Sequence, residues 1–154
     1  MKKIAIGADD AAYDFRDAII SFLEEKGIGV IDYSSDKNKF INLYPDVAHA
    51  VAMSIKNNEH ERGILICGTG IGMSIVANKV PGVRAAQCHD TFSAERARMS
   101  NNAQIMTMGA RVIGIELGKK IVQAWLDAEY AGGRSAPKVE RIDYYEKQHA
   151  KNPQ

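Results

Sequence analysis

The chain has few of the residues that mark several special classes of protein. Its 154 residues include only two cysteines, four prolines and one tryptophan, and its net charge is +1. The spacing of Cys67 and Cys88 fits neither a zinc site nor a disulfide framework. A near-neutral charge argues against binding to nucleic acid. We therefore expect no metal ion, no cofactor, no disulfide and no nucleic-acid partner.

Long apolar runs are also absent from the sequence. No stretch of 18 apolar residues occurs, so no segment is expected to cross a membrane. The first ten residues, MKKIAIGADD, have a short apolar run that ends at two aspartates, which does not resemble a signal peptide. These features predict a cytoplasmic protein.

The sequence does contain a regular alternation of short apolar runs and helical patterns. Continuous apolar runs separated by helices are typical of a parallel sheet covered on both faces. We predict a three-layer α/β/α, Rossmann-like fold with a five-stranded parallel sheet in residues 1–131. Strands are predicted at 3–7, 29–33, 63–67, 83–88 and 104–108, and helices at 11–26, 44–57, 70–78, 91–101 and 113–130.

Residues 132–154 differ in composition from the rest of the chain. After two glycines this C-terminal tail is basic and polar, with a few apolar residues among them. Such a tail can pack on its own domain or reach another subunit. We favour the second arrangement.

Polar residues follow three of the predicted strands, where sites lie in open parallel sheets. Asp9 and Asp10 follow the first strand, Cys67 ends the third, and His89 and Asp90 follow the fourth. These groups converge if the strands are neighbours. The two aspartates after the first strand could equally cap the next helix.

The segment "ILICGTGIGMSIVANKV" has Cys67 at the end of a strand, followed by Gly68, Gly70 and Gly72 before a helix. Backbone N–H groups at such a turn bind anions, and their partial positive charge favours a thiolate. A base and an oxyanion site could therefore share one turn. Cys67 could instead be a small buried apolar residue.

A dinucleotide site is the other function that these glycines suggest. Asp90 even follows them at a suitable distance for an acid that binds ribose. However, the spacing is G-x-G-x-G rather than G-x-G-x-x-G, with Met73 at the third position, and no P-loop lysine follows. We expect Cys88 to be structural, and His49 and His60 to lie on the surface.

Two longer motifs, "ICGTGIGMSIVANKVPGVRAA" and "SAERARMSNNAQIMTMGARVIG", together with "GGR" before a basic tail, resemble the ribose-5-phosphate isomerase B family. That family includes galactose-6-phosphate isomerase subunits. The resemblance implies a metal-independent isomerase that interconverts phosphorylated aldoses and ketoses through an enediol. It also implies a homodimer or tetramer with each site at a subunit boundary.

The resemblance further assigns roles to individual residues. It implies that Cys67 is the base, and that Thr69 and the turn from Gly68 through Gly70 to Gly72 bind the enediolate. By the same resemblance Asp9 contacts substrate hydroxyls, Tyr44 lies near the pocket mouth and Asn101 belongs to the enediolate pocket. The residues matching the family's phosphate ligands are Arg111, Arg134 and Lys138.

Three positions depart from the family's pattern. Asp10 replaces a histidine that helps to bind phosphate, Ser100 replaces a ring-opening histidine, and Ser135 replaces the histidine of "GRH". A four-carbon sugar 4-phosphate cannot close a furanose ring, because its O4 is esterified, and so needs no ring-opening base. The chain is similar to a branch of the family that acts on tetrose phosphates, which favours D-erythrulose 4-phosphate and D-erythrose 4-phosphate as the substrate pair.

Other substrates and one other role stay open. Ribose 5-phosphate remains possible if His89 opens the ring, and a six-carbon sugar phosphate is a further alternative. Some chains of this family are partner subunits that lack the cysteine, whereas this chain has both Cys67 and Thr69.

Overall fold

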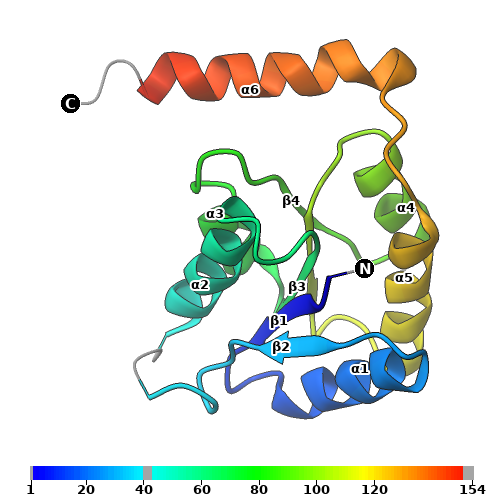
Figure 1. Ribbon diagram of the computed structural model, residues 1–154. Helices are drawn as coiled ribbons and strands as arrows, with labels where there is room; N and C mark the ends of the chain where they lie inside the picture. The colour runs from blue at the N-terminus through cyan, green and yellow to red at the C-terminus, as the bar shows by residue number, and fades with distance from the viewer. Residues whose placement is uncertain (1, 40–42, 151–154) are drawn as a thin grey trace.

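Five short strands form one parallel sheet in the computed structural model, which describes residues 2–39 and 43–150 (Figure 1). The strands are β1 (Ile4–Ala8), β2 (Val30–Asp32), β3 (Gly63–Cys67), β4 (Ala85–Gln87) and β5 (Ile105–Gly109). Their order in the sheet is β2-β1-β3-β5-β4. Every residue of β1, β3 and β5 is buried, as expected for strands covered on both faces.

Helices cover both faces of this sheet. One face is covered by α1 (Tyr13–Glu25), α4 (Thr91–Met99) and α5 (Ile115–Asp127), and the other by α2 (Tyr44–Lys56) and α3 (Ile71–Ala77). The first face encloses Trp125, which is completely buried, and the second encloses Met73. The predicted three-layer α/β/α fold with a five-stranded parallel sheet is confirmed. Among the described residues, no helix is long and apolar enough to cross a membrane.

The C-terminal tail is helical, a feature that its sequence pattern does not predict. A short 3-10 turn, η1 (Gly133–Ser135), leads into α6 (Ala136–Ala150). Figure 1 shows α6 lying apart from the three layers, along one edge of the molecule. It touches the body through an ion pair between Asp143 and Arg84 and a hydrogen bond from the N–H of Gly82 to Glu146.

The order of the strands changes one detail of the expected site. The sequence predicts that the ends of the first, third and fourth strands meet if these strands are neighbours. β1 and β3 are neighbours, but β5 lies between β3 and β4. The carboxyl end of β5 therefore lies between those of β3 and β4. Residues that follow β4 reach this position with their side chains.

The expectation that His60 lies on the surface is wrong. His60 is only 6% exposed, its Nδ1 donates to the carbonyl oxygen of Lys3, and its Nε2 accepts from the hydroxyl of Tyr33. The charged residues around it in the sequence suggested a surface loop, but the loop folds back on the sheet. His49 is exposed and Cys88 is buried, as expected.

Candidate active site

The carboxyl end of β3 forms a tight turn around the sulfur of Cys67. The N–H of Gly70 donates a hydrogen bond to Sγ of Cys67 over 3.0 Å. Gly70 has a φ of 77°, and a Cβ there would lie 2.9 Å from the backbone of Met108. Only glycine fits this left-handed conformation at such close approach. This turn therefore fixes the thiol of Cys67 and a backbone N–H that points at its sulfur.

The hydroxyl of Thr69 lies in the same turn and is exposed. Its Oγ1 accepts a hydrogen bond from the N–H of Ile71 over 3.2 Å, which leaves its own proton free to donate. The carbonyl oxygen of Thr69 accepts from Nε2 of Gln87 over 2.8 Å. Thr69 can thus present an O–H donor next to Cys67 without breaking a contact that holds the turn.

Asp9 and Arg111 lie at the same edge of the sheet as Cys67. The N–H of Asp9 donates to the carbonyl of Ile66, and its Oδ1 accepts from the N–H of Ala11. Burial raises the pKa of the Asp9 carboxyl; the N–H of Ala11 and the charge of Arg111 oppose this shift, while Asp10 adds to it. The guanidinium of Arg111 packs against Gly68, where a Cβ would lie 3.5 Å from it.

The neighbouring Asp10 has a different environment from Asp9. It is exposed and lines a pocket between the start of α1 and the loop before α5, together with Tyr13 and Ile113. Neither aspartate caps α1, because that helix begins after Ala12 and has no side-chain cap. The carboxylate of Asp10 is therefore free to face whatever enters this pocket.

The ring of Tyr44 lies directly over Gly72. A Cβ on Gly72 would lie 2.3 Å from the ring of Tyr44, so the two residues are in close contact. Tyr44 is the first residue of α2, and its ring reaches the start of α3. This contact joins Tyr44 to the turn that contains Cys67 and Thr69.

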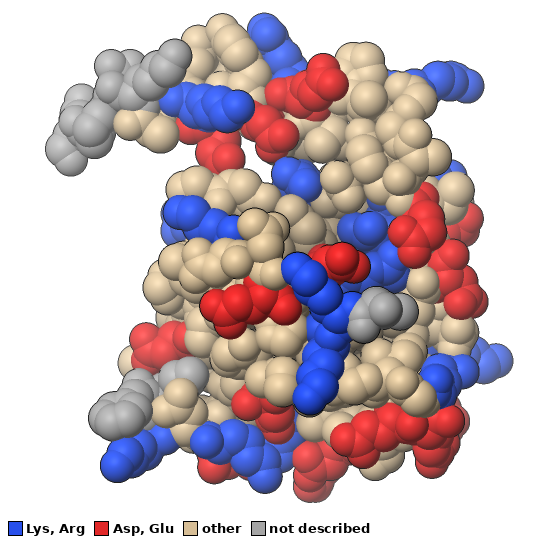
Figure 2. Space-filling view, in the orientation of Figure 1, with Lys and Arg blue, Asp and Glu red and all other residues tan. Residues whose placement is uncertain are grey.

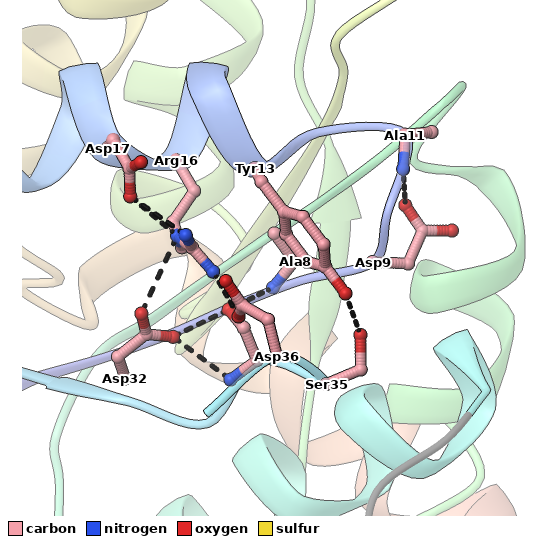
Figure 3. A network of polar contacts seen from close by, with 10 residues as sticks. Ala8, Asp9, Ala11, Tyr13, Arg16, Asp17, Asp32, Ser35 and Asp36 are labelled. Atoms are coloured by element: carbon pink, nitrogen blue, oxygen red, sulfur yellow. Dashed lines mark hydrogen bonds and ion pairs between the residues drawn. The ribbon is translucent and has the colours of Figure 1, made fainter. Parts of the chain in front are cut away.

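Polar contacts fix the chain on the other side of Asp9 (Figure 3). Oγ of the buried Ser34 accepts from the N–H of Ala8 and donates to Asp32. Arg16, which is 2% exposed, pairs with three carboxylates: Asp17 of its own helix, Asp32 at the end of β2, and Asp36 in the loop after β2. The hydrogen bond from Arg16 lowers the pKa of Asp36. The end of β1, the start of α1 and the loop after β2 are thus held as one unit.

The side chain of His89 crosses from β4 to the end of β5. Its Nε2 accepts a hydrogen bond from the N–H of Gly109 over 2.9 Å. A neutral ring that accepts at Nε2 carries its proton on Nδ1. Asp90 caps α4 by accepting from the N–H and the hydroxyl of Ser93, which accounts for this acid without a dinucleotide.

Four of the predicted residues lie away from this cluster. Ser100 and Asn101 follow α4, at the edge of the sheet where the strands begin, so the length of β5, about 13 Å, separates them from Cys67. Arg134 lies in η1 and Lys138 in α6, which follow the end of α5 at that same edge. One chain therefore brings together Asp9, Tyr44, Cys67, Thr69, His89 and Arg111, but not these four.

Two residues that position the turn were not expected from the sequence. Thr107 is completely buried in β5, and its hydroxyl donates to the carbonyl oxygen of Gly70 over 2.8 Å. Gln87 ends β4 and holds Thr69. A single hydroxyl inside an apolar strand was the available signal for Thr107. Within the described residues, no three His, Cys, Asp or Glu side chains are grouped to hold a metal ion.

Residues 4–142 match the Ribose/Galactose Isomerase family. The chain belongs to this family. A D-erythrulose-4-phosphate isomerase of Pectobacterium atrosepticum is 63% identical over 148 residues, which cover 96% of this chain and 97% of that protein. A ribose-5-P isomerase B of Listeria innocua is 53% identical, covering 92% of this chain and 95% of its own length.

Solved structures of the ribose/galactose isomerase family share the fold of this chain. The ribose-5-phosphate isomerase B of Clostridium thermocellum has a TM-score of 0.90 and 44% identity, covering 96% of this chain and 99% of that one. Both the resemblance and the reaction class expected from the sequence are thereby confirmed. The chain is an isomerase of phosphorylated sugars.

Proposed function

We propose that this isomerase interconverts D-erythrulose 4-phosphate and D-erythrose 4-phosphate, with Cys67 as the base. The observation that carries the role of Cys67 is its position: the sulfur receives the N–H of Gly70 beside the free hydroxyl proton of Thr69. The thiolate takes a proton from C1 of the ketose, and the C–H electron pair forms the C1–C2 double bond. The carbonyl oxygen at C2 becomes the enediolate oxygen.

The second half of the reaction returns the same proton to the other carbon. The enediolate oxygen takes the proton of the C1 hydroxyl, the C1–O1 double bond forms, and the thiol of Cys67 protonates C2 to give the aldose. The hydroxyl of Thr69 donates to the oxygen that carries the negative charge. One such donor is worth about 3 kcal/mol in the transition state.

The tetrose substrate is supported by the state of His89 and by the relative from Pectobacterium. A ribose 5-phosphate isomerase must open a furanose ring, and His89 is the histidine that the sequence suggested as a ring-opening base. Its Nε2 lone pair is already occupied by the N–H of Gly109. The D-erythrulose-4-phosphate isomerase of Pectobacterium is 63% identical to this chain. A substrate that cannot form a furanose needs no such base.

The exposed Asp10 is consistent with a shorter substrate. Its carboxylate lies in the pocket beside the start of α1 and would repel a phosphate group there. A four-carbon sugar phosphate is one carbon shorter than ribose 5-phosphate, so its phosphate group lies nearer to the reacting carbons. Asp10 would therefore disfavour the five-carbon substrate more than the four-carbon one.

We further propose that a second copy of the chain completes each site, in a homodimer or tetramer. Asn101, Arg134 and Lys138 lie at the far edge of the sheet from Cys67, so they reach the sulfur of another subunit more readily than their own. The helix α6 supports this assembly, because it lies apart from the body and exposes Ile142, Tyr144 and Tyr145. In this assembly the partner supplies the phosphate ligands of the tail, while Arg111 comes from the same chain as Cys67.

The first test is kcat/KM for D-erythrose 4-phosphate and for D-ribose 5-phosphate, measured side by side. We expect a preference of at least about a hundredfold for the tetrose, or about 2.7 kcal/mol in transition-state binding. Equal or higher activity on ribose 5-phosphate would overturn the substrate assignment. In that case His89→Ala should abolish ribose turnover.

The variant Cys67→Ala tests the proposed role of the thiol. We expect it to lose nearly all turnover while it keeps the fold, since alanine fills most of the space of a buried cysteine. A chain that served only as an assembly subunit would tolerate this change. Unchanged turnover would therefore overturn the proposed mechanism.

A further inference from the structure

The side chain of Arg84 joins two segments that lie far apart in the sequence. Arg84 immediately precedes β4, and its side chain is 17% exposed. Its Nε donates to the carbonyl oxygen of Asn102 over 2.9 Å, and its Nη1 donates to Oδ1 of Asp143 over 3.2 Å. One guanidinium thus holds the turn after α4 and the helix α6 at the same time.

Each of these two segments carries residues that the proposed function assigns to the neighbouring subunit's site. Asn102 directly follows Asn101, and its φ of 49° sets the direction in which the chain leaves α4. Asp143 lies in α6, the helix that contains Lys138 and begins just after Arg134. Arg84 therefore links the segment of Asn101, which the proposed function assigns to the enediolate, directly to the segment of Arg134 and Lys138, which it assigns to the phosphate group.

We propose that Arg84 is a positioning residue for the half of the active site that one subunit lends to the other. This inference rests on the proposed shared site. The rigid, planar guanidinium can bind two acceptors in fixed directions, whereas a lysine offers one point charge. Arg84 sets the distance between Asn101 and the tail residues, and hence between the enediolate and the phosphate group of one substrate.

The backbone around Arg84 is fixed well enough to serve as a reference point. The N–H of Arg84 donates to Oε1 of Gln104 over 2.8 Å, and Nε2 of Gln104 donates to the carbonyl oxygen of Gly82 over 3.0 Å. The N–H of Gly82 in turn donates to Glu146 of α6. α6 therefore has a second anchor, and loss of the Arg84 contacts should shift the helix without releasing it.

Two variants separate the two contacts of Arg84. Arg84→Gln removes both and should lower kcat/KM by about a hundredfold, the cost of a displacement of about 1 Å in an active site. Asp143→Asn removes only the charge through which α6 binds Arg84. It should raise KM, because α6 carries phosphate ligands, and leave kcat within about twofold, because the turn after α4 is unchanged.

Hybrid assemblies show in which subunit Arg84 acts. Cys67→Ala chains and Arg84→Gln chains, carrying different affinity tags, are expressed together and purified through both tags. In a hybrid dimer, one site combines an intact Cys67 with an intact Arg84 from the other chain. That dimer should regain about half of the wild-type turnover, because one of two equivalent sites is complete.

A matched hybrid of Cys67→Ala with Asn101→Ala tests the shared site itself. Recovery in both hybrids supports the inference. Recovery with Asn101→Ala but not with Arg84→Gln would mean that Arg84 acts within its own subunit, which overturns the inference and leaves the shared site intact. No recovery in either hybrid would overturn the shared site and the inference together.

Folding defects are separated from loss of positioning by two further measurements. The thermal unfolding of each homomeric variant is recorded, and Arg84→Lys is used in the hybrid if Arg84→Gln does not fold. Arg84→Lys should restore stability but not kcat/KM, since it cannot reach both acceptors. Full activity of either Arg84 variant would overturn the inference.

Discussion

The N–H of Gly70 points at Sγ of Cys67 from 3.0 Å, within a turn that only a left-handed glycine can form. The hydroxyl of Thr107, in the neighbouring strand β5, fixes this turn by donating a hydrogen bond to the carbonyl oxygen of Gly70. Gly70 is thus held through both its N–H and its carbonyl oxygen, with the N–H aimed at the sulfur. A fixed donor of this kind stabilises negative charge without a cost for reorganisation.

The two thiols should differ in reactivity. Cys88 is 1% exposed, and burial raises its pKa to about 12. Little of its reactive thiolate form exists near neutral pH. With iodoacetamide at pH 8, the native protein should take up one label, at Cys67, and the unfolded protein two, as counted by mass spectrometry. Cys67→Ala should take up none when native; labelling of Cys88 in the native protein would contradict this prediction.

The contact between Gly72 and Tyr44 should be visible as energetic coupling. Gly72→Ala places a methyl group 2.3 Å from the ring of Tyr44 and must displace that ring from the site. We expect kcat/KM to fall about tenfold for Gly72→Ala and for Tyr44→Ala. The double variant should be no worse than either single one, because residues in contact are not additive.

A control for this prediction uses another glycine at a helix start. Gly114 precedes α5 with a φ of −82°, and a Cβ there would meet nothing within 4 Å. Gly114→Ala should keep kcat/KM within about twofold of the wild type. Additive losses in the Gly72 and Tyr44 double variant would show that Tyr44 is not the group through which Gly72→Ala acts.

The pH profile should reflect the carboxyl of Asp9. Burial raises its pKa, so as the pH falls it gains a proton earlier than an ordinary aspartate does. If the ionised form accepts hydrogen bonds from substrate hydroxyls, kcat/KM falls on the acid side at a pH above the usual aspartate range. This fall in kcat/KM should vanish in Asp9→Asn. In Asp10→Asn it should move to lower pH, because the negative charge of Asp10, which raises the pKa of Asp9, is removed. A fall that Asp9→Asn leaves unchanged would contradict this assignment.

Arg62 should contribute to stability rather than to the reaction. It is 7% exposed and donates to the carbonyl oxygens of Trp125, Leu126 and Ala128 at the end of α5. Arg62→Met leaves these buried carbonyls without partners and should lower the free energy of unfolding by about 3 kcal/mol. Glu129→Gln, which removes the negative charge of the exposed partner of Arg62, should cost less than about 1 kcal/mol in urea unfolding.

The predicted elements were close to the observed ones because each depends on nearby residues. Apolar runs such as those of β1 and β3 are buried on both faces, and the predicted strand at 63–67 matches β3 in both bounds. The strand predicted at 83–88 is shorter in the structure, since β4 comprises only Ala85–Gln87. An edge strand has one neighbour, which supports fewer ladder bonds at its ends.

Features that depend on distant contacts could not be predicted in this way. His60 follows a charged stretch, but its ring is buried because Lys3 and Tyr33, both remote in sequence, supply its hydrogen-bond partners. The tail has too few apolar residues for a clear helical pattern, yet α6 forms. Its residues pair with Gly82 and Arg84, which no local pattern reveals.

The sequence by itself determined the alternation of strands and helices and the chemistry of the turn at Cys67, because both follow from neighbouring residues. Glycines placed next to a strand-terminal thiol specify a donor-rich turn wherever the chain folds. Only the tertiary structure decided that β3 lies between β1 and β5, and that Asn101 and Lys138 lie at the opposite edge from Cys67. Strand order is decided by packing over the whole sheet. The two halves of the site are separated because α4 and α5 run back from the carboxyl ends of the strands to their amino ends, where α6 contacts Gly82 and Arg84.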